Sequence, residues 1–304
     1  MTQLQEVSTA GSAPRGAGLR SLRNLSPYAG VLPFFGLTGI FLLWPTWSVI
    51  SGAFQDDKGR FSLKTIESVL KNVGHRAAFI HTLQLSFITA LIGGIIGSLF
   101  AWSIATGKKD GFLRRITLSA SGVLAQFGGV MLTFAFLATF GFTGLVRNFF
   151  LAHAKHSFFA NPTWLYSITG LVIVYSFFQI PLMFLVFLPT IDNMKPQWRE
   201  ASDSLGGGTF EYWRRVGIPV LTPSFLGAFL LLFANAFSAY ATAASLISQG
   251  SIITPLEIAG SLSSETGAVN PALAKALSLT MVVVVVIVMT LYTLLRRKVS
   301  KWEK

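Results

Sequence analysis

The sequence predicts an all-α integral membrane protein with six spanning helices and both termini on the cytoplasmic side. Three observations support this fold class: few charged residues, six long apolar segments, and an uneven distribution of lysine and arginine between them. Of the 304 residues, 52% are hydrophobic and 12% are charged, whereas a soluble domain carries roughly a quarter charged residues. The net charge is +12, and the lysines and arginines lie between the apolar segments. We therefore interpret them as residues that set the membrane orientation and contact anionic lipid, and not as a nucleic-acid-binding surface.

A spanning helix needs about 20 mostly apolar residues. Residues 1–27, rich in small residues and arginine, are interpreted as a flexible cytoplasmic tail, and residues 28–304 as one six-span domain. A cleavable signal peptide is not expected, because the first apolar segment starts late and is followed by others. These segments are too long and too little alternated for the strands of a barrel. The six predicted spans are Tyr28–Phe54, Ile80–Thr106, Ile116–Gly141, Trp164–Pro189, Val220–Tyr240 and Ala272–Leu295.

The placement of basic residues gives the orientation. If the N-terminus is cytoplasmic, most of the 24 lysines and arginines fall in the tail, in the second and fourth connections and after the last span, as the positive-inside rule requires. The first outer loop keeps several basic residues and fits less well. The loop Ala241–Pro271 carries Glu257 and Glu265 but no lysine or arginine, which suits the outside.

The middle of every span is free of Asp, Glu, Lys and Arg, which argues against a proton-coupled transporter or an ion pump. Polar uncharged side chains there have two explanations: hydrogen bonds between helices, or the lining of a path for a polar solute. The possible path-lining residues are Gln84, Gln126, Ser176, Gln179 and Asn235. Gly93 and Gly97 form a GxxxG pair, which predicts close helix packing.

We expect no catalytic, metal or cofactor site in this chain. It has no cysteine and no phosphate-binding loop, HExxH or GxSxG motif. His153 and His156 have the spacing of metal ligands, but no carboxylate or cysteine accompanies them.

A polar insert between the fourth and fifth apolar segments, residues 192–219, predicts two short amphipathic helices. Pro196 can open the first helix, and the glycines Gly206–Gly208 end it, since glycine adopts the left-handed conformation of a helix stop. Thr209 is expected to cap the second helix. Gly217 and Pro219 are expected to turn the chain into the fifth span. The first helix has an apolar stripe formed by Trp198, Ala201, Ser202 and Leu205. From the residues alone, this insert fits a bilayer surface or a groove on a protein equally well.

The insert resembles the "EAA" loop of permeases of binding-protein-dependent ABC importers: E-A-A, three residues, G, nine residues, I, one residue, L-P. The matching residues are Glu200-Ala201-Ser202, Gly206, Val216 and Ile218-Pro219. The spacing agrees throughout, and the three substitutions are mild in size. The resemblance covers about residues 80–295. It implies the six-helix, MetI-like fold of type I ABC importer permeases, in the inner membrane of a bacterium.

The resemblance also implies partners: two ATPase subunits that hold ATP and Mg²⁺, a second permease subunit and an extracytoplasmic solute-binding protein. This chain would be a transporter subunit and not an enzyme. Its loop would dock in a groove of the ATPase, with Glu200 holding the loop geometry and Gly206 forming the elbow. The residues implied in coupling are Trp198, Glu200, Ala201, Leu205, Gly206, Phe210 and Pro219.

The segment from Leu232 to Leu279 is similar to the subgroup of these permeases that serves spermidine/putrescine, related amines, phosphonates and iron(III). The absence of a T-x-G-G-P turn after the fifth span speaks against the sugar-uptake subgroup, which stays an alternative. A third interpretation is a membrane protein of another class whose insert only anchors it to the bilayer surface.

Overall fold

The computed structural model describes residues 31–55, 59–108, 110–153, 162–247, 253–263 and 269–299; the expected tail, residues 1–27, lies outside this part. The chain divides into two compact units, residues up to Ser51 and residues from Gly52 onward. The N-terminal helix consists of α3 (Leu32–Thr38), the π-helical turn η1 (Gly39–Leu43) and α4 (Trp44–Ala53). A wider π turn just before Pro45 accommodates a ring that lacks an N–H group and crowds the preceding turn.

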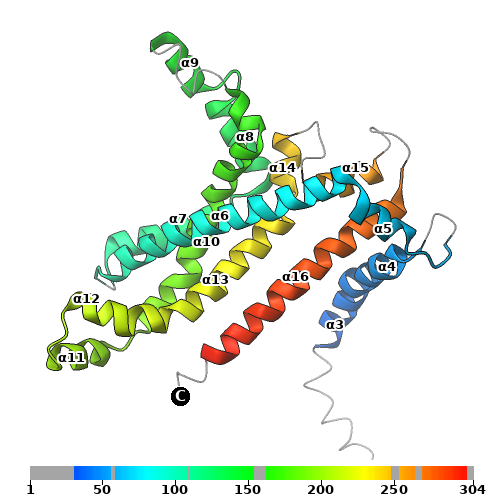
Figure 1. Cartoon of the computed structure of the whole chain (residues 1–304). Coiled ribbons are helices and arrows are strands. Elements are labelled where there is room, and N and C mark those ends of the chain that lie inside the picture. Colours follow the sequence, from blue (N-terminus) through cyan, green and yellow to red (C-terminus); the bar gives the residue numbers. More distant parts are fainter. Residues whose placement is uncertain are drawn as a thin grey trace, which may run out of the picture. The chain divides into compact units, whose positions relative to one another are not determined.

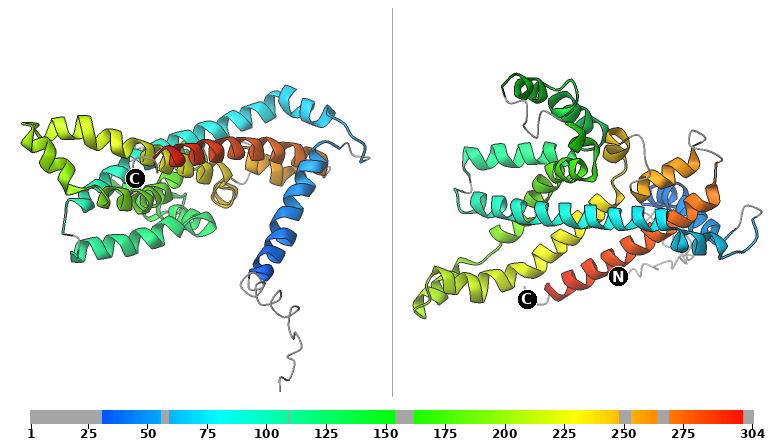
Figure 2. Two further views of the ribbon diagram at one scale, coloured as in Figure 1. Left: turned by 90° about the horizontal axis from the view of Figure 1, so that it is seen from below. Right: turned by 45° about the horizontal axis from the view of Figure 1, so that its top comes forward.

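The second unit is all-helical over its described residues, apart from one isolated β-bridge that joins Gln55 to Phe61. In Figures 1 and 2, α13 and α16 lie side by side, and α8 packs against α14 and leads into α9. The elements are α5 (Lys64–Lys71), α6 (Val73–Ala105), α7 (Phe112–Gln126), α8 (Gly129–Phe140), α9 (Leu145–His153), η3 (Pro162–Tyr166), α10 (Ile168–Asp192), α11 (Pro196–Ser204), α12 (Thr209–Tyr212), η4 (Trp213–Gly217), α13 (Ile218–Ser238), α14 (Ala241–Leu246), α15 (Thr254–Leu262) and α16 (Pro271–Val299).

Six helical segments among the described residues are long and apolar enough to cross a membrane, which confirms the predicted number. The third segment differs from the prediction. The expected span Ile116–Gly141 is broken, because α7 ends at Gln126 and α8 begins at Gly129, whose φ is 67°. A left-handed residue interrupts a right-handed helix, and glycine adopts this conformation without a Cβ clash. The apolar segment that reaches spanning length is instead Gly129–Phe149.

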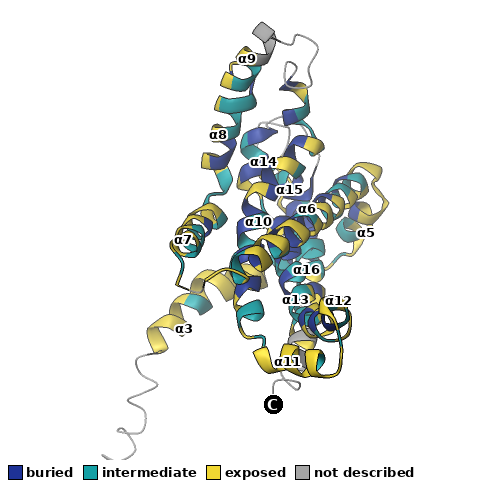
Figure 3. Cartoon of the chain, turned by 90° about the vertical axis from the view of Figure 1, so that its left-hand side faces the viewer, coloured by how far each residue is buried: buried dark blue, intermediate teal, exposed yellow. Residues whose placement is uncertain are grey.

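The core of the second unit lies around α10, which contacts α6, α7 and α13. Figure 3 shows α10 as largely buried, whereas α11 is mostly exposed. Two apolar clusters meet along α10: Phe184 and Met183 pack with Leu232 and Phe237 of α13, and Tyr175 packs in the second cluster. The Tyr175 hydroxyl donates to the Ala239 carbonyl at 2.7 Å, so this buried polar group is satisfied.

The glycine pair on α6 packs against α10, as the GxxxG spacing predicts. A Cβ on Gly93 would lie 2.7 Å from the Cβ of Gln179, and one on Gly97 would lie 2.6 Å from the Ile180 carbonyl oxygen. Both distances are too short for a side chain. The two backbones therefore approach closely because glycine occupies these positions.

The predicted outer loop Ala241–Pro271 contains two short helices, α14 and α15, and α15 is fixed to α6 by side chains. The Thr254 amide donates to the Thr82 hydroxyl at 2.9 Å, and His75 Nδ1 lies 3.2 Å from Glu257 Oε2. Burial raises the pKa of Glu257, and the adjacent His75 opposes this shift. These polar contacts join segments far apart in the sequence, which is why hydropathy alone does not predict them.

At the C-terminal end of α10, an ion pair joins Arg114 of α7 to Asp192, the last residue of α10. The two side chains are 12% and 25% exposed, and Arg114 Nη1 is buried without a hydrogen-bond partner among the described residues. Removal of the carboxylate charge would leave a largely buried guanidinium without its counter-charge.

Replacing Asp192 with asparagine is therefore expected to lower the free energy of unfolding by about 2 kcal/mol, less than for a fully buried pair because water reaches Asp192. The measurement is thermal unfolding of the purified protein in detergent. The matched control is Glu67→Gln, which breaks the exposed pair of Glu67 with Lys71 and should cost below about 0.5 kcal/mol. Equal stability of the two variants would contradict the assignment.

Candidate functional site

The insert between α10 and α13 begins with α11 and ends that helix at the glycines. Lys195 is extended (φ −74°, ψ 125°) and Pro196 occupies the first turn of α11, as expected for a residue that precedes proline. Gly206 has a φ of 77°. Its amide donates to the Asp203 carbonyl at 3.0 Å, and the Gly207 amide donates to the Ser202 carbonyl at 2.9 Å. This is the Schellman arrangement, so the predicted glycine stop is confirmed.

The start of the second helix differs from the prediction in its cap. Gly208, extended at φ −78° and ψ 176°, is the N-cap of α12, and no side chain caps the helix. Thr209 is the first helical residue, and its hydroxyl accepts a hydrogen bond from Arg199 Nη2 at 2.9 Å. The prediction that Thr209 caps α12 is wrong, because the extended glycine takes the cap position.

The expected turn at Gly217 and Pro219 is also wrong, since α12, η4 and α13 run on in helical conformation. The cap residues Trp213 and Ile218 both have right-handed helical dihedral angles. The π-helical turn η4 precedes Pro219 just as η1 precedes Pro45. Gly217 has a packing role: a Cβ there would lie 2.5 Å from the Trp213 ring. A displacement of α12 is therefore carried into α13 by one helix.

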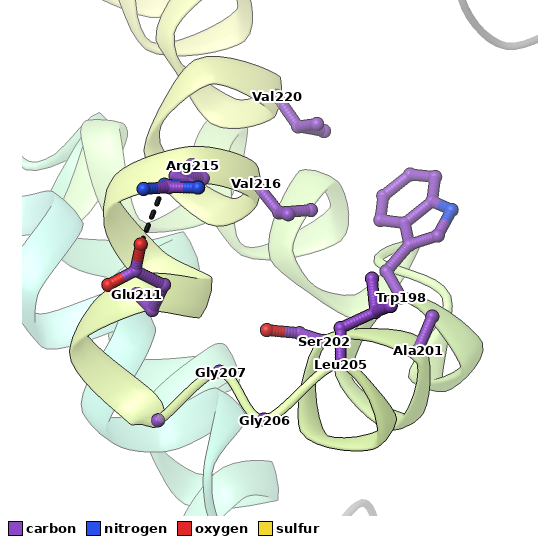
Figure 4. Close-up of a pocket in the computed structure, with 11 residues that line it drawn as sticks. Trp198, Ala201, Ser202, Leu205, Gly206, Gly207, Glu211, Arg215, Val216 and Val220 are labelled. Carbon is purple, nitrogen blue, oxygen red and sulfur yellow. Dashed lines mark ion pairs between the residues drawn. The ribbon is translucent and has the colours of Figure 1, made fainter.

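A hollow of about 610 Å³ lies between α11 and the beginning of α13. Figure 4 shows Trp198 and Ala201 of α11 and its C-cap residue Leu205 on one side of it, with Val216 and Val220 on the other. Gly206 also lines the hollow. Leu205 is 89% exposed, although leucine gains free energy when it is buried. The apolar stripe of α11 therefore borders an open apolar surface.

The other residues implied in coupling do not line this hollow. Glu200 and Pro219 are exposed, and the Phe210 side chain is 75% exposed. Glu200 forms no ion pair with any residue that the structure describes. Four of the seven residues thus gather around the hollow, and three lie on the outer surface of the insert.

The five possible path-lining residues fall into two groups. Gln84, Gln126 and Asn235 are exposed on the surface of the single chain. Ser176 and Gln179 are buried: Ser176 donates to the Val172 carbonyl in its own helix at 2.7 Å, and Gln179 Nε2 donates to the Leu232 carbonyl of α13 at 2.9 Å. The buried pair makes hydrogen bonds within the fold, whereas the other three lie at the surface of the single chain.

The residue that sequence reasoning missed is Arg199. Its guanidinium contacts Thr209 and lies over the ring of Tyr212, 5.4 Å from the ring centroid. No motif points to Tyr212 either, although it is only 5% exposed. The four-residue interval from Arg199 to Asp203 suggests a pair along the helix, but contacts across the glycines depend on the fold.

Comparison with known proteins places this chain among transport proteins. A family model described as "Binding-protein-dependent transport system inner membrane component" matches residues 93–301. The sulfate transport system permease protein CysT of Salmonella typhimurium is 24% identical over 164 residues, or 54% of this chain and 56% of the relative. CysT of Escherichia coli K12 is 24% identical over 172 residues, or 57% and 59%. The chain thus spans less than two thirds of the length of these relatives.

One other relative and two solved structures match a larger share of this chain than the CysT proteins do. The sulfate permease protein CysW of Synechocystis is 24% identical over 218 residues, 70% of this chain and 72% of the relative. A crystal structure of a bacterial ABC transporter that imports the acidic polysaccharide alginate superposes with a TM-score of 0.71 at 16% identity, covering 94% of this chain and 100% of that chain. A bacterial alginate ABC transporter in complex with its alginate pentasaccharide-bound periplasmic protein also gives 0.71, at 18% identity. These homologues are transporter subunits, and the structural match supports the MetI-like permease fold.

Proposed function

Because this chain belongs to the family of binding-protein-dependent transport system inner membrane components, whose model matches residues 93–301, we propose that it forms half of the pore of an ATP-driven importer. A solute-binding protein delivers the solute on the outer side, a second permease completes the pore, and two separate ATPase subunits supply the energy. Both termini and the insert lie in the cytoplasm in this proposal.

The observation that carries the proposal is the construction of the insert. The exposed helix α11 connects through the Gly206 stop to α12, and α12 continues without interruption into the spanning helix α13. An ATPase that binds the surface formed by Leu205, Phe210 and the hollow can therefore move α13 through α12. Movement of a packed helix is the kind of shift that reorients a transport path.

The path itself is proposed to run along the surface that meets the second permease. Gln84 and Asn235 are exposed polar side chains on apolar spanning segments, and Gln126 is the exposed last residue of α7. A polar side chain is costly in lipid and is accommodated at a helix interface or a water-filled cavity. These three residues are assigned to the path, and the buried Ser176 and Gln179 to the stability of the bundle.

For the solute we propose an anion. The relatives are named for sulfate, and the solved transporter imports alginate, an acidic polysaccharide. Within the six apolar segments that the structure describes, the carboxylates are Asp192 and Glu211, both near segment ends and paired with arginines. A path without free carboxylates suits an anion better than a polyamine cation, so sulfate replaces the amine and iron(III) solutes that the subgroup resemblance implied.

The experiment is reconstitution in proteoliposomes of this chain with its ATPase, second permease and binding protein. The chain alone should hydrolyse no ATP, and the complex should show ATP-dependent uptake of radiolabelled sulfate that unlabelled sulfate competes away. Stimulation of uptake and ATPase by spermidine or a neutral sugar, with none by sulfate, would overturn the solute proposal. Photocrosslinks from Leu205 that reach lipid but never the ATPase would instead favour the surface anchor.

A further inference from the structure

We propose that Arg199 is a positioning residue that fixes α11 relative to α12, and thereby determines how much of an ATPase movement reaches α13. The consequence for transport rests on the proposed function, but the fixing of α11 does not. Arg199 lies on α11, immediately before Glu200. Among the described residues, it makes the side-chain hydrogen bond that crosses from α11 to α12.

The guanidinium of Arg199 lies close to three other side chains. Its Nη2 donates to Thr209 Oγ1 at 2.9 Å, its Nε lies 3.7 Å from Asp203 Oδ2, and its Cζ lies 5.4 Å from the centroid of the Tyr212 ring. Asp203 holds the guanidinium on α11, while Thr209 and Tyr212 both belong to α12. Each contact by itself is weak at a surface site, but three together restrict both the distance and the rotation between the two helices.

The far side of this contact is anchored in the bundle. The Tyr212 ring packs edge-on against Trp213 at 5.6 Å between centroids, and Trp213 packs edge-on against Trp102 of α6 at 6.0 Å. Aromatic pairs with this geometry are favourable beyond the area that they bury. Arg199 is therefore linked through a chain of rings to α6 as well as to α13.

The surroundings explain why such a residue is needed. The segment between α11 and α12 contains Gly206, Gly207 and Gly208, and glycine permits many backbone conformations. The hollow lies between α11 and the beginning of α13, with Ala201 and Leu205 on one side and Val216 and Val220 on the other. Without the Arg199 contacts, α11 can rotate about the glycines. A movement of the ATPase then rotates α11 and does not displace α13.

The chemistry requires arginine in particular. The guanidinium donates to Thr209 while its Cζ lies over the Tyr212 ring, and a planar guanidinium suits both contacts, whereas a lysine ammonium is a compact point charge. Arg199→Ala removes all contacts, and Arg199→Lys keeps only the charge. Thr209→Val removes the acceptor with little change of shape. Tyr212→Phe keeps the ring and is the matched control.

The first measurement needs no partner protein. The natural chain has no cysteine, so spin labels can be attached at Gln197→Cys on α11 and Thr222→Cys on α13, both exposed, in the full chain in lipid nanodiscs. The distance distribution should be narrow in the parent and in Tyr212→Phe, and broad in Arg199→Ala and Thr209→Val. A distribution in Arg199→Ala as narrow as in the parent overturns the proposal.

The second measurement is the number of solute molecules imported per ATP hydrolysed in the reconstituted complex. Arg199→Ala should lower this ratio about fivefold, the size expected for loss of surface contacts of this kind, with assembly unchanged and partial recovery in Arg199→Lys. An unchanged ratio overturns the role in coupling. A parent complex that imports nothing contradicts the proposed function instead, while the spin-label distances still decide whether Arg199 fixes α11.

Discussion

Replacing Gly206 with alanine is expected to reduce ATP-dependent uptake about tenfold while the protein still folds and assembles. Gly206 has a φ of 77°, a conformation that costs an L-residue with a Cβ about 1–2 kcal/mol, and about 1.4 kcal/mol corresponds to a factor of ten. The strain is relieved by opening the Schellman hydrogen bonds of Gly206 and Gly207, which changes the direction in which α11 leaves α12. The bundle is unaffected because these residues lie outside its core.

The matched control is Gly208→Ala, two residues further along the same segment. Gly208 is extended at φ −78°, and a Cβ there would meet nothing within 4 Å, so alanine fits without strain. Uptake in proteoliposomes and co-elution with the ATPase are measured for both variants. Equal uptake by the two would show that the left-handed conformation at Gly206 has no part in coupling.

Replacing Gly97 with valine is expected to have a large effect on stability. A Cβ on Gly97 would lie 2.6 Å from both the Ile180 carbonyl oxygen and the Met183 Cβ, so α6 and α10 have to move apart. Overpacking of a tight core costs typically about 1–3 kcal/mol, and here the first obstacle is backbone, which cannot rotate away. The expected result is a clear loss of thermal stability and of monodisperse protein in detergent.

The control for this change is Gly122→Val on α7. A Cβ on Gly122 would meet nothing within 4 Å, so the same increase in volume finds open space. Thermal unfolding in detergent should separate the two variants clearly. Similar unfolding of Gly97→Val and the parent protein would contradict the close approach of α6 and α10.

Much of the fold was predictable because membrane insertion depends on the local sequence. Each spanning segment needs sufficient length and hydropathy of its own, and satisfies its backbone hydrogen bonds internally. The number of spans, the glycine pair on α6 and the glycine stop at Gly206 follow from such local rules. The resemblance of Glu200–Pro219 to a family pattern then led to the same family that the comparison identifies.

The errors arose where two local signals competed. Ile116–Gly141 is apolar enough for one span, but the left-handed Gly129 breaks it. Gly217 and Pro219 suggested a turn, but the π-helical η4 accommodates the proline and the Trp213 ring covers Gly217. Thr209 is a good capping residue, but Gly208 has the extended conformation of the cap. Composition does not say which of two acceptable conformations a glycine adopts.

By itself, the sequence determined that this chain is a six-span helical protein with a polar insert whose first short helix ends at a glycine stop, since hydropathy, helix starts and glycine stops are properties of neighbouring residues. Only the tertiary structure decided what the insert is joined to. The continuation of α12 into α13, the hollow beside α11, and the contacts of Arg199 with Thr209 and Tyr212 depend on how separate helices meet. Such contacts depend on how whole helices pack against each other. A local sequence pattern does not predict that packing.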